Sequence, residues 1–273
     1  MKAIFNPLIK WIVNTSIGWY IAKLIMRFAE WLRFEKSKLE HASAAHKLKF
    51  FFNDLIVKDG YFKGLNYPGF SSFGSSLFPK LSGSYESELF PFFKQMEIKK
   101  YDIIMDIGCA EGFYAIGLAL KYPNATVEAF DIEPEARRLC RMMAEVNNVN
   151  HQISISEACT PAHIKNIDTN LSTFIICDCE GYERTLFNED NIKSLINTDV
   201  LIELHPMHVK DVKEYLLQLF DKTHHLRLIG SHDDNRKLFD LPDMFDQFSK
   251  LERSLLVTEG RSFSMDWLIA IPK

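Results

Sequence analysis

Seven residues near the middle of the chain have the types and the spacing that a ligand-binding turn requires. The segment Asp106-Ile107-Gly108-Cys109-Ala110-Glu111-Gly112 places two glycines just after an acid. Gly108 and Gly112 let the backbone turn tightly and approach a ligand closely. Ala110 stands where a GxGxxG pyrophosphate loop has its middle glycine, which disfavours a dinucleotide and tolerates a smaller ligand. The carboxylate of Asp106 would repel a phosphate and suits an ammonium or hydroxyl group instead.

A second acid is placed to hold a sugar. Asp131 ends the apolar run Ala129-Phe130-Asp131, 25 residues after Asp106. An acid at about this distance from a glycine turn accepts hydrogen bonds from the hydroxyls of a ribose. The alternative is a carboxylate that only favours the N-terminus of the following helix.

A third group combines carboxylates with one imidazole. Asp178 and Glu180 lie two residues apart, as do Glu203 and His205. Because the unperturbed pKa of histidine lies near neutrality, we expect His205 to be a general base, with Asp178 orienting substrate or cofactor. A positioned base accelerates a reaction that deprotonates a hydroxyl by roughly 10²–10⁴-fold. The alternative for His205 is a hydrogen-bonded structural role.

We expect no metal among these residues. The carboxylate and imidazole groups of Asp178, Glu180 and His205 suit a manganese or magnesium site only loosely. A pair formed by His205 and His208 would need a helix that already begins at residue 205, which Pro206 opposes.

The elements that must position these residues alternate along the chain from residue 84 onward. Strands are expected at 101–107, 126–131, 151–157, 172–178, 199–205, 225–230 and 265–271, and helices at 84–97, 112–121, 133–147 and 207–220. The alternation predicts an α/β fold, a doubly wound, seven-stranded, mostly parallel sheet. A long helical insertion at 239–257 precedes a last, antiparallel strand. Ligands bind at the carboxyl ends of such strands, so the polar residues should meet at one edge.

Two of these motifs resemble those of the class I S-adenosylmethionine-dependent methyltransferases. DIGCAEG is similar to the first motif of that class, from which Ala110 departs, and FDIEP is similar to the second. The resemblance implies a Rossmann-like methyltransferase with S-adenosyl-L-methionine as its cofactor. It places Gly108–Ala110 near the methionine and ribose, and Glu157–Thr160 at the adenine. The implied cofactor-binding residues are Asp106, Gly108, Cys109, Ala110, Gly112, Asp131, Ile132, Ala158, Cys159 and Asp178.

Three further stretches resemble the FkbM-type branch of these enzymes: DCEGYE, IELHP and the earlier GSYE at residues 83–86. This resemblance implies O-methylation of a hydroxyl on a sugar, a glycan or a natural-product-like small molecule. The candidate substrate residues are Tyr85, Glu86, Glu180, Glu203 and Arg261, and the alternative for Arg261 is a solvated side chain. Two other functions stay open: a non-catalytic cofactor-binding scaffold subunit with the same fold, and a nicotinamide-dependent oxidoreductase.

The N-terminal part differs in composition from the rest. Residues 1–81 are expected to form a helical extension and linker, with Ser- and Gly-rich residues 71–83 as the linker, and residues 82–273 the methyltransferase domain. The longest uncharged stretch, residues 11–22, is shorter than the roughly 20 apolar residues that span a bilayer. Tryptophans and lysines in residues 1–34 suit a helix at a membrane interface. The alternative is a helix that packs on the body or across a homodimer.

Charge and cysteine content narrow the partners and the compartment. With 32 Lys and Arg against 36 Asp and Glu, the net charge is −4, which argues against nucleic acid as the main partner. Residues 1–60 hold ten basic and five acidic residues, so about +5. Five cysteines, an odd number without a CxxC pair, indicate a reducing compartment. We therefore expect a cytoplasmic protein, associated with the cytoplasmic face of a membrane if residues 1–34 lie at an interface.

Overall fold

The computed structural model describes residues 2–207, 210–260 and 265–273, with the backbone alone for residues 2–6 and 8. The chain divides into two compact units, one that ends at Phe51 and one that runs from Phe52 to Lys273. Residues 52–81 thus belong to the second unit, which begins 30 residues before the boundary expected at Ser82.

The first unit consists of helices α1 (Lys2–Asn14) and α2 (Ser16–Phe51). Helix α2 is long and continuous because no proline or glycine follows Gly18 within it. Large apolar side chains of this unit are exposed, including Trp19 at 47% and Phe28 at 59%. None of the helices that the structure describes is both long enough and apolar enough to cross a membrane.

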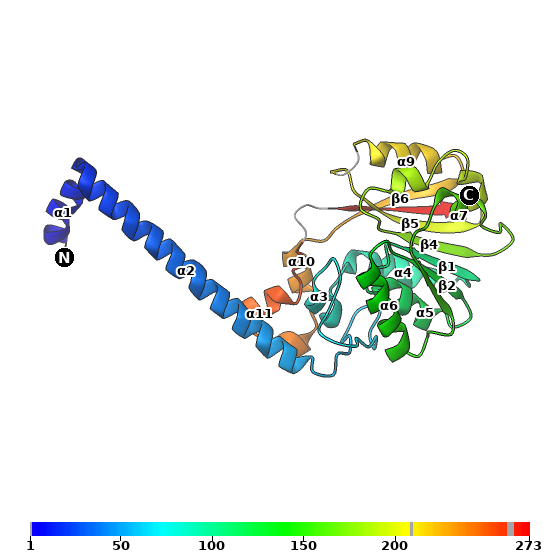
Figure 1. Ribbon diagram of the computed structural model, residues 1–273, viewed down its shortest axis with the longest axis horizontal. Coiled ribbons are helices and arrows are strands. Elements are labelled where there is room, and N and C mark those ends of the chain that lie inside the picture. The colour runs from blue at the N-terminus through cyan, green and yellow to red at the C-terminus, as the bar shows by residue number, and fades with distance from the viewer. Residues whose placement is uncertain (1, 208–209, 261–264) are drawn as a thin grey trace. The chain divides into compact units, whose positions relative to one another are not determined.

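The second unit contains one seven-stranded sheet, which confirms the predicted fold class. Its strands are β1 (Ile103–Ile107), β2 (Thr126–Phe130), β3 (Ile153–Ser156), β4 (Thr173–Cys177), β5 (Thr198–Leu204), β6 (His224–Gly230) and β7 (Asp266–Pro272). They follow the order β3-β2-β1-β4-β5-β7-β6. The pairs from β3 to β5 are parallel, and β7 is antiparallel to both neighbours. Figure 1 shows this order, from β6 beside α9 to β2 beside α5.

Helices connect and cover these strands. They are α3 (Leu77–Ser82), α4 (Phe90–Met96), α5 (Phe113–Lys121), α6 (Pro134–Val146), α7 (Pro161–Lys165), α8 (Glu183–Leu186), α9 (Val212–Phe220), α10 (Asp234–Phe239) and α11 (Lys250–Leu255), with 3₁₀ turns at Ser87–Leu89, Ile192–Leu195 and Asp243–Phe245. α5 packs on β1 and β2, and α6 on β3. β1, β4 and β5 are buried almost throughout, as parallel strands covered on both faces must be.

Three segments differ from the sequence-based expectation. Residues 71–83 are not an open linker, because they include α3, whose Leu81 and Ser82 are fully buried. The helix expected from residue 84 begins as an α-helix only at Phe90, because Glu86 adopts a left-handed backbone with φ 47°. The insertion at 239–257 forms short helices rather than a long one, since Pro242 interrupts it.

Candidate functional site

The glycine turn after β1 is pressed against the end of β4. Gly108 has φ +86°, and a Cβ built on it would lie 1.7 Å from the carbonyl oxygen of Asp178. The N–H of Asp178 in turn donates to the carbonyl of Ile107 at 2.8 Å. Only glycine therefore fits at position 108, and the turn and the β4 terminus form one edge.

The amide groups of this turn are engaged within the protein. The N–H groups of Gly108 and Cys109 both donate to the carbonyl of Phe130, at 2.8 and 2.9 Å. The N–H of Ala110 donates to Asp131 Oδ2 at 2.9 Å, and Ala110 itself has φ +48°. A phosphate cradle requires free amides that point at the anion. The turn is therefore not a pyrophosphate loop, in agreement with the substitution of the middle glycine.

Asp131 is fixed at the end of β2 and keeps unused acceptor sites. Its Oδ2 accepts from Ala110 and its Oδ1 from the N–H of Glu133 at 2.8 Å. A carboxylate has about four lone-pair sites, so about two remain for a ligand. Ile132, which follows it, is 69% exposed. The carboxylate is thus preorganised where a ribose was expected.

Asp106 contacts the fold rather than the open edge. It is 2% exposed, and its Oδ2 accepts from the N–H of Ala115 in the first turn of α5 at 2.7 Å. Burial raises the pKa of Asp106 to about 7; the hydrogen bond from Ala115 opposes this rise, while the charges of Asp131 and Glu111 add to it. Its structural role is therefore to cap α5, and a direct contact with a cofactor stays a prediction.

Glu111, to which the sequence gave no role, joins the supposed linker to the turn. Its carboxylate is 1% exposed and accepts from Lys80 Nζ at 2.5 Å, Ser72 Oγ at 2.8 Å and Tyr67 OH at 3.1 Å. Burial would raise the pKa of Glu111, but the Lys80 ammonium lowers it below the ordinary value. Residues 67–80 are thereby held against the glycine turn.

The remaining predicted cofactor residues differ in exposure. Gly112, the N-cap of α5, has φ +96°, and a Cβ there would lie 2.8 Å from Cys140 Sγ. Ala158 is exposed two residues beyond β3, and Cys159 beside it is buried. Cys109 is also buried, so it faces a ligand only through its backbone.

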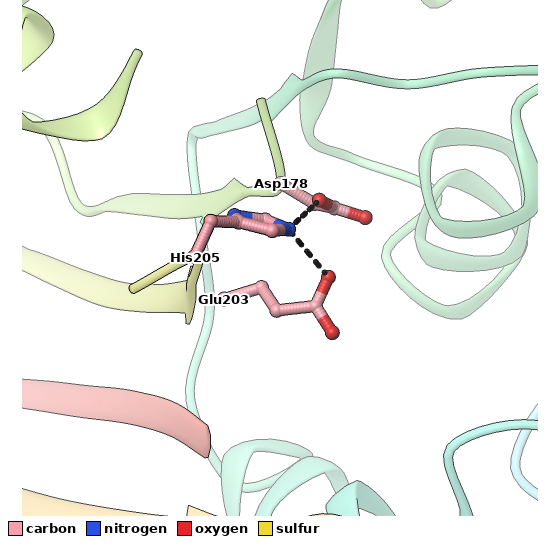
Figure 2. Close-up of side chains that lie close together, drawn as sticks. All are labelled: Asp178, Glu203 and His205. Atoms are coloured by element: carbon pink, nitrogen blue, oxygen red, sulfur yellow. Dashed lines mark ion pairs between the residues drawn. The ribbon is translucent and has the colours of Figure 1, made fainter. Parts of the chain in front are cut away.

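The third group of residues converges on one imidazole at the ends of β4 and β5. His205 is 1% exposed, and its Nε2 lies 3.3 Å from Asp178 Oδ1, 3.4 Å from Glu203 Oε2 and 3.6 Å from Glu180 Oε2. Figure 2 shows Asp178 and Glu203 directed at the same ring nitrogen. The structure thus brings together all four residues that the sequence selected on these two strands.

Glu183 is the residue of this group that sequence reasoning missed. Its side chain is fully buried, and its Oε1 lies 2.9 Å from His205 Nδ1. The same oxygen accepts from the N–H groups of Cys179 at 3.3 Å and Gly181 at 3.2 Å. One carboxylate oxygen therefore fixes both the DCEGYE loop and the imidazole. The only signal in the sequence was its position two residues after the glycine of that loop.

The electrostatics of the cluster assign its protons. Burial alone would lower the pKa of His205, but hydrogen bonds to Glu183 and Glu203 and the charge of Asp178 raise it to about 11. Burial and the neighbouring Glu203 raise the pKa of Asp178 well above its usual range. His205 is therefore an imidazolium near neutral pH, so the general-base role expected for it is wrong for this protonation state.

The other candidate substrate residues are placed differently. Tyr85 is buried and packs edge-on against Phe113, with ring centroids 5.4 Å apart. The N–H of Glu86 donates to Glu259 Oε1 at 2.8 Å, and its carboxylate accepts from Tyr114 OH. Glu180 has a side chain that is 72% exposed. Arg261, like His208, lies outside the described residues.

Two cavities, of about 240 and 450 Å³, lie away from this edge. The larger is lined by Lys99, Ser172 and Asp199, at the amino ends of the strands. The smaller lies between Met96 and the strand residues Arg227 and Ile269. Neither cavity includes a residue of the clusters described above.

Comparison with known protein families gives a match that covers the first three strands. Residues 89–173, which include β1, β2 and β3, match the family model of the methyltransferase small domain. No curated protein sequence matches the chain significantly.

Several solved structures share the general arrangement. The precorrin-6y C5,15-methyltransferase of Geobacter metallireducens is 10% identical, with a TM-score of 0.45 over 69% of this chain and 88% of that one. The O-methyltransferase TomG of Streptomyces achromogenes is 9% identical, with a TM-score of 0.45 over 66% and 77%. An O-methyltransferase of Bacillus cereus is 11% identical, with a TM-score of 0.44 over 66% and 78%. At such scores none of them bears on the reaction of this chain.

The strand order and the residues that follow β1 and β2 identify the fold of the second unit. The sheet has its single reversed strand, β7, between β5 and β6. A glycine turn follows β1 and an acid follows β2, within the segment that matches the methyltransferase family. The second unit therefore has a Rossmann-like α/β fold, and its residues 89–173 match the methyltransferase small domain.

Proposed function

We propose that the protein is an S-adenosylmethionine-dependent methyltransferase that methylates a hydroxyl group of a sugar, a glycan or a natural-product-like small molecule. The observation that carries this proposal is the contact of Gly108 with the Asp178 carbonyl, which joins the cofactor turn to the polar cluster. A ribose held by Asp131 would lie at the same edge as His205. The two halves of a methyl-transfer site are thus adjacent.

The chemistry needs alignment more than covalent catalysis. S-adenosylmethionine supplies a methyl group on a sulfonium, and the acceptor oxygen must approach in line with the carbon–sulfur bond. Asp178 and His205, one residue beyond β4 and β5, would orient the acceptor hydroxyl, and the Asp178 carboxylate would take up its proton. Because His205 Nδ1 is held by Glu183, only Nε2 faces the acceptor.

The resemblance of DCEGYE, IELHP and GSYE to the FkbM-type branch supports the proposed substrate class. In the DCEGYE loop, Glu180 and Gly181 both have positive φ, 53° and 104°. This double left-handed turn brings the Glu183 carboxylate back to the loop's own amides and to His205. We infer that the motif exists to position the histidine beside the acceptor.

The proposal is tested by binding first and by turnover second. Calorimetric titration with S-adenosylhomocysteine should give one site per chain, and NAD should give none. An acceptor screen with saturating S-adenosylmethionine should begin with glycans and hydroxylated metabolites. With an acceptor found, His205→Ala should lower kcat by about 10²-fold or more while S-adenosylhomocysteine still binds. Full turnover by that variant would refute the role of His205.

We also propose that residues 1–34 attach the protein to the cytoplasmic face of a membrane. Exposed apolar side chains such as Trp11, Trp19 and Trp31 are accompanied by Lys10 and Lys23, a composition that suits the lipid interface. All five cysteines are free thiols, in keeping with a reducing cytoplasm.

Flotation with anionic vesicles tests this attachment. The full chain should float and a chain lacking residues 1–34 should not. If both stay in the soluble fraction, these residues have another role, and a homodimer detected by light scattering would identify it.

A further inference from the structure

We propose that Asp178, Glu203 and His205 form a binding site for one divalent cation of the manganese and magnesium class. The inference rests on the proposed function, because the cation would lie in the acceptor half of that site and bind the acceptor oxygen. It replaces the expectation from sequence that the site holds no metal.

The three ligand atoms have the separation that a single cation requires. His205 Nε2 is 3.3 Å from Asp178 Oδ1 and 3.4 Å from Glu203 Oε2, and all three atoms lie within 4.8 Å of one another. Bonds of about 2.1 Å at right angles place neighbouring ligand atoms about 3.0 Å apart. Figure 2 shows the three side chains converging from the ends of two adjacent strands. A small inward movement would complete the coordination.

The imidazole is oriented as in a metal ligand. Glu183 Oε1 lies 2.9 Å from Nδ1, so the N–H is on that side and Nε2 faces the two carboxylates. A buried carboxylate behind a histidine is the usual outer partner that fixes the ring and raises its basicity toward a metal. The exposed fraction of the Glu183 side chain is 0%, so the partner is part of the core.

One buried carboxylate oxygen of this cluster lacks a hydrogen-bond donor among the described residues. Asp178 Oδ1 is buried, yet it accepts no hydrogen bond from the residues that the structure describes. Its distance of 3.3 Å from Nε2 exceeds the 2.7–2.9 Å of a charge-assisted hydrogen bond. Buried carboxylate oxygens are otherwise almost always paired. A cation between Oδ1 and Nε2 would give this carboxylate oxygen a partner.

The charge and the type of the ligands select the cation. Four carboxylates lie within 3.6 Å of this one ring, and a dication offsets their repulsion. Two carboxylate oxygens and one imidazole nitrogen, without a thiolate, suit a cation that prefers octahedral oxygen coordination. Three protein ligands leave three positions for water and the acceptor hydroxyl. On binding, the cation takes the place of the proton on Nε2, which is released to solvent.

The test is a titration of the full chain with Mn²⁺ after treatment with a chelator, followed by electron paramagnetic resonance. One Mn²⁺ per chain should bind, and Asp178→Asn and Glu203→Gln should each weaken binding at least 10-fold. Glu189→Gln removes a carboxylate that is 65% exposed and pairs with the surface residue Lys222, so it should leave binding unchanged.

A second measurement uses the wild-type protein, so it does not depend on whether a variant folds. Pulsed resonance on the wild-type complex should show coupling of Mn²⁺ to an imidazole nitrogen. Absence of this coupling, or equal Mn²⁺ affinity in wild type, Asp178→Asn and Glu203→Gln, would overturn the site. S-adenosylhomocysteine is titrated separately: its binding without Mn²⁺ binding refutes the cation alone, and the reverse result refutes the methyltransferase alone.

Discussion

The two halves of the carboxyl edge are built by different means. At the ends of β1 and β2, the backbone shapes the site: Gly108 has no room for a side chain, and the amides of the turn are engaged by Phe130 and Asp131. At the ends of β4 and β5, charged side chains shape it, with Asp178 and Glu203 gathered around His205. Under the proposed function, the first half would bind the invariant cofactor, and the second half would be the part that varies with the acceptor.

The largest effect is expected from a substitution in the glycine turn after β1, which belongs to the half that the backbone shapes. Gly108→Ala places a Cβ 1.7 Å from a backbone oxygen that cannot rotate away, in a residue with φ +86°. Left-handed strain and steric overlap together should lower the free energy of unfolding by more than about 4 kcal/mol. Gly64→Ala is the matched control, because Gly64 has φ +93° and no atom within 4 Å of the added Cβ. It should cost about 1–2 kcal/mol. Equal losses in urea unfolding would show that the contact with Asp178 is unimportant.

A second change tests the segment that covers this half. Lys80→Met leaves the Glu111 carboxylate buried without its cation, so unfolding free energy should fall by about 3 kcal/mol. Lys222→Met, which breaks an exposed pair with Glu189, should cost less than about 1 kcal/mol. Both are measured by urea unfolding. A loss for Lys80→Met as small as that of the control would mean that residues 67–80 are not anchored through Glu111.

A third change tests how the free energy of unfolding depends on pH through the buried carboxyl group of Asp106. The pKa of Asp106 is about 7 in the folded chain against an ordinary 3.8, so between these values the folded state holds a proton that the unfolded state has lost. Stability therefore falls as pH rises through this window. Relative to wild type, Asp106→Asn should gain about 2 kcal/mol between pH 5 and pH 8.

Urea unfolding of both proteins at the two pH values measures this gain. Asp102→Asn, at an exposed position just before β1, should show no comparable change. A stability difference between wild type and Asp106→Asn that is constant with pH would contradict the buried titration.

The smallest effect is expected from a substitution in the cluster around His205, at the ends of β4 and β5. Glu183→Gln keeps the volume but removes the charge that holds His205 Nδ1 and two loop amides. Turnover and Mn²⁺ affinity should each fall about 10-fold, as is usual when an outer partner of a ligating histidine is lost. Glu189→Gln should change neither. A fall in unfolding free energy with unchanged turnover and unchanged Mn²⁺ affinity would assign Glu183 to the scaffold alone.

The sequence was most informative where local pattern decides the structure. Long apolar runs predicted all seven strands, and they correctly predicted Asp131 at the end of the second strand. The Lys80–Glu111 pair was missed because its residues are 31 apart and the first lies in a segment with the composition of a linker. Glu183 was missed because its reach to His205 depends on the left-handed turn before it. Burial of Asp106 under α5 is likewise a tertiary property that spacing does not report.

The most direct test of the central claim is the affinity for S-adenosylhomocysteine of the wild type, Asp131→Ala and the control Glu133→Ala, whose exposed side chain lies beside the site. Loss of hydrogen bonds from ribose to a carboxylate should weaken binding at least about 10-fold in Asp131→Ala, with Glu133→Ala unchanged and all three proteins folded. No binding by the wild type, or the same dissociation constant with and without the Asp131 carboxylate, would contradict the account.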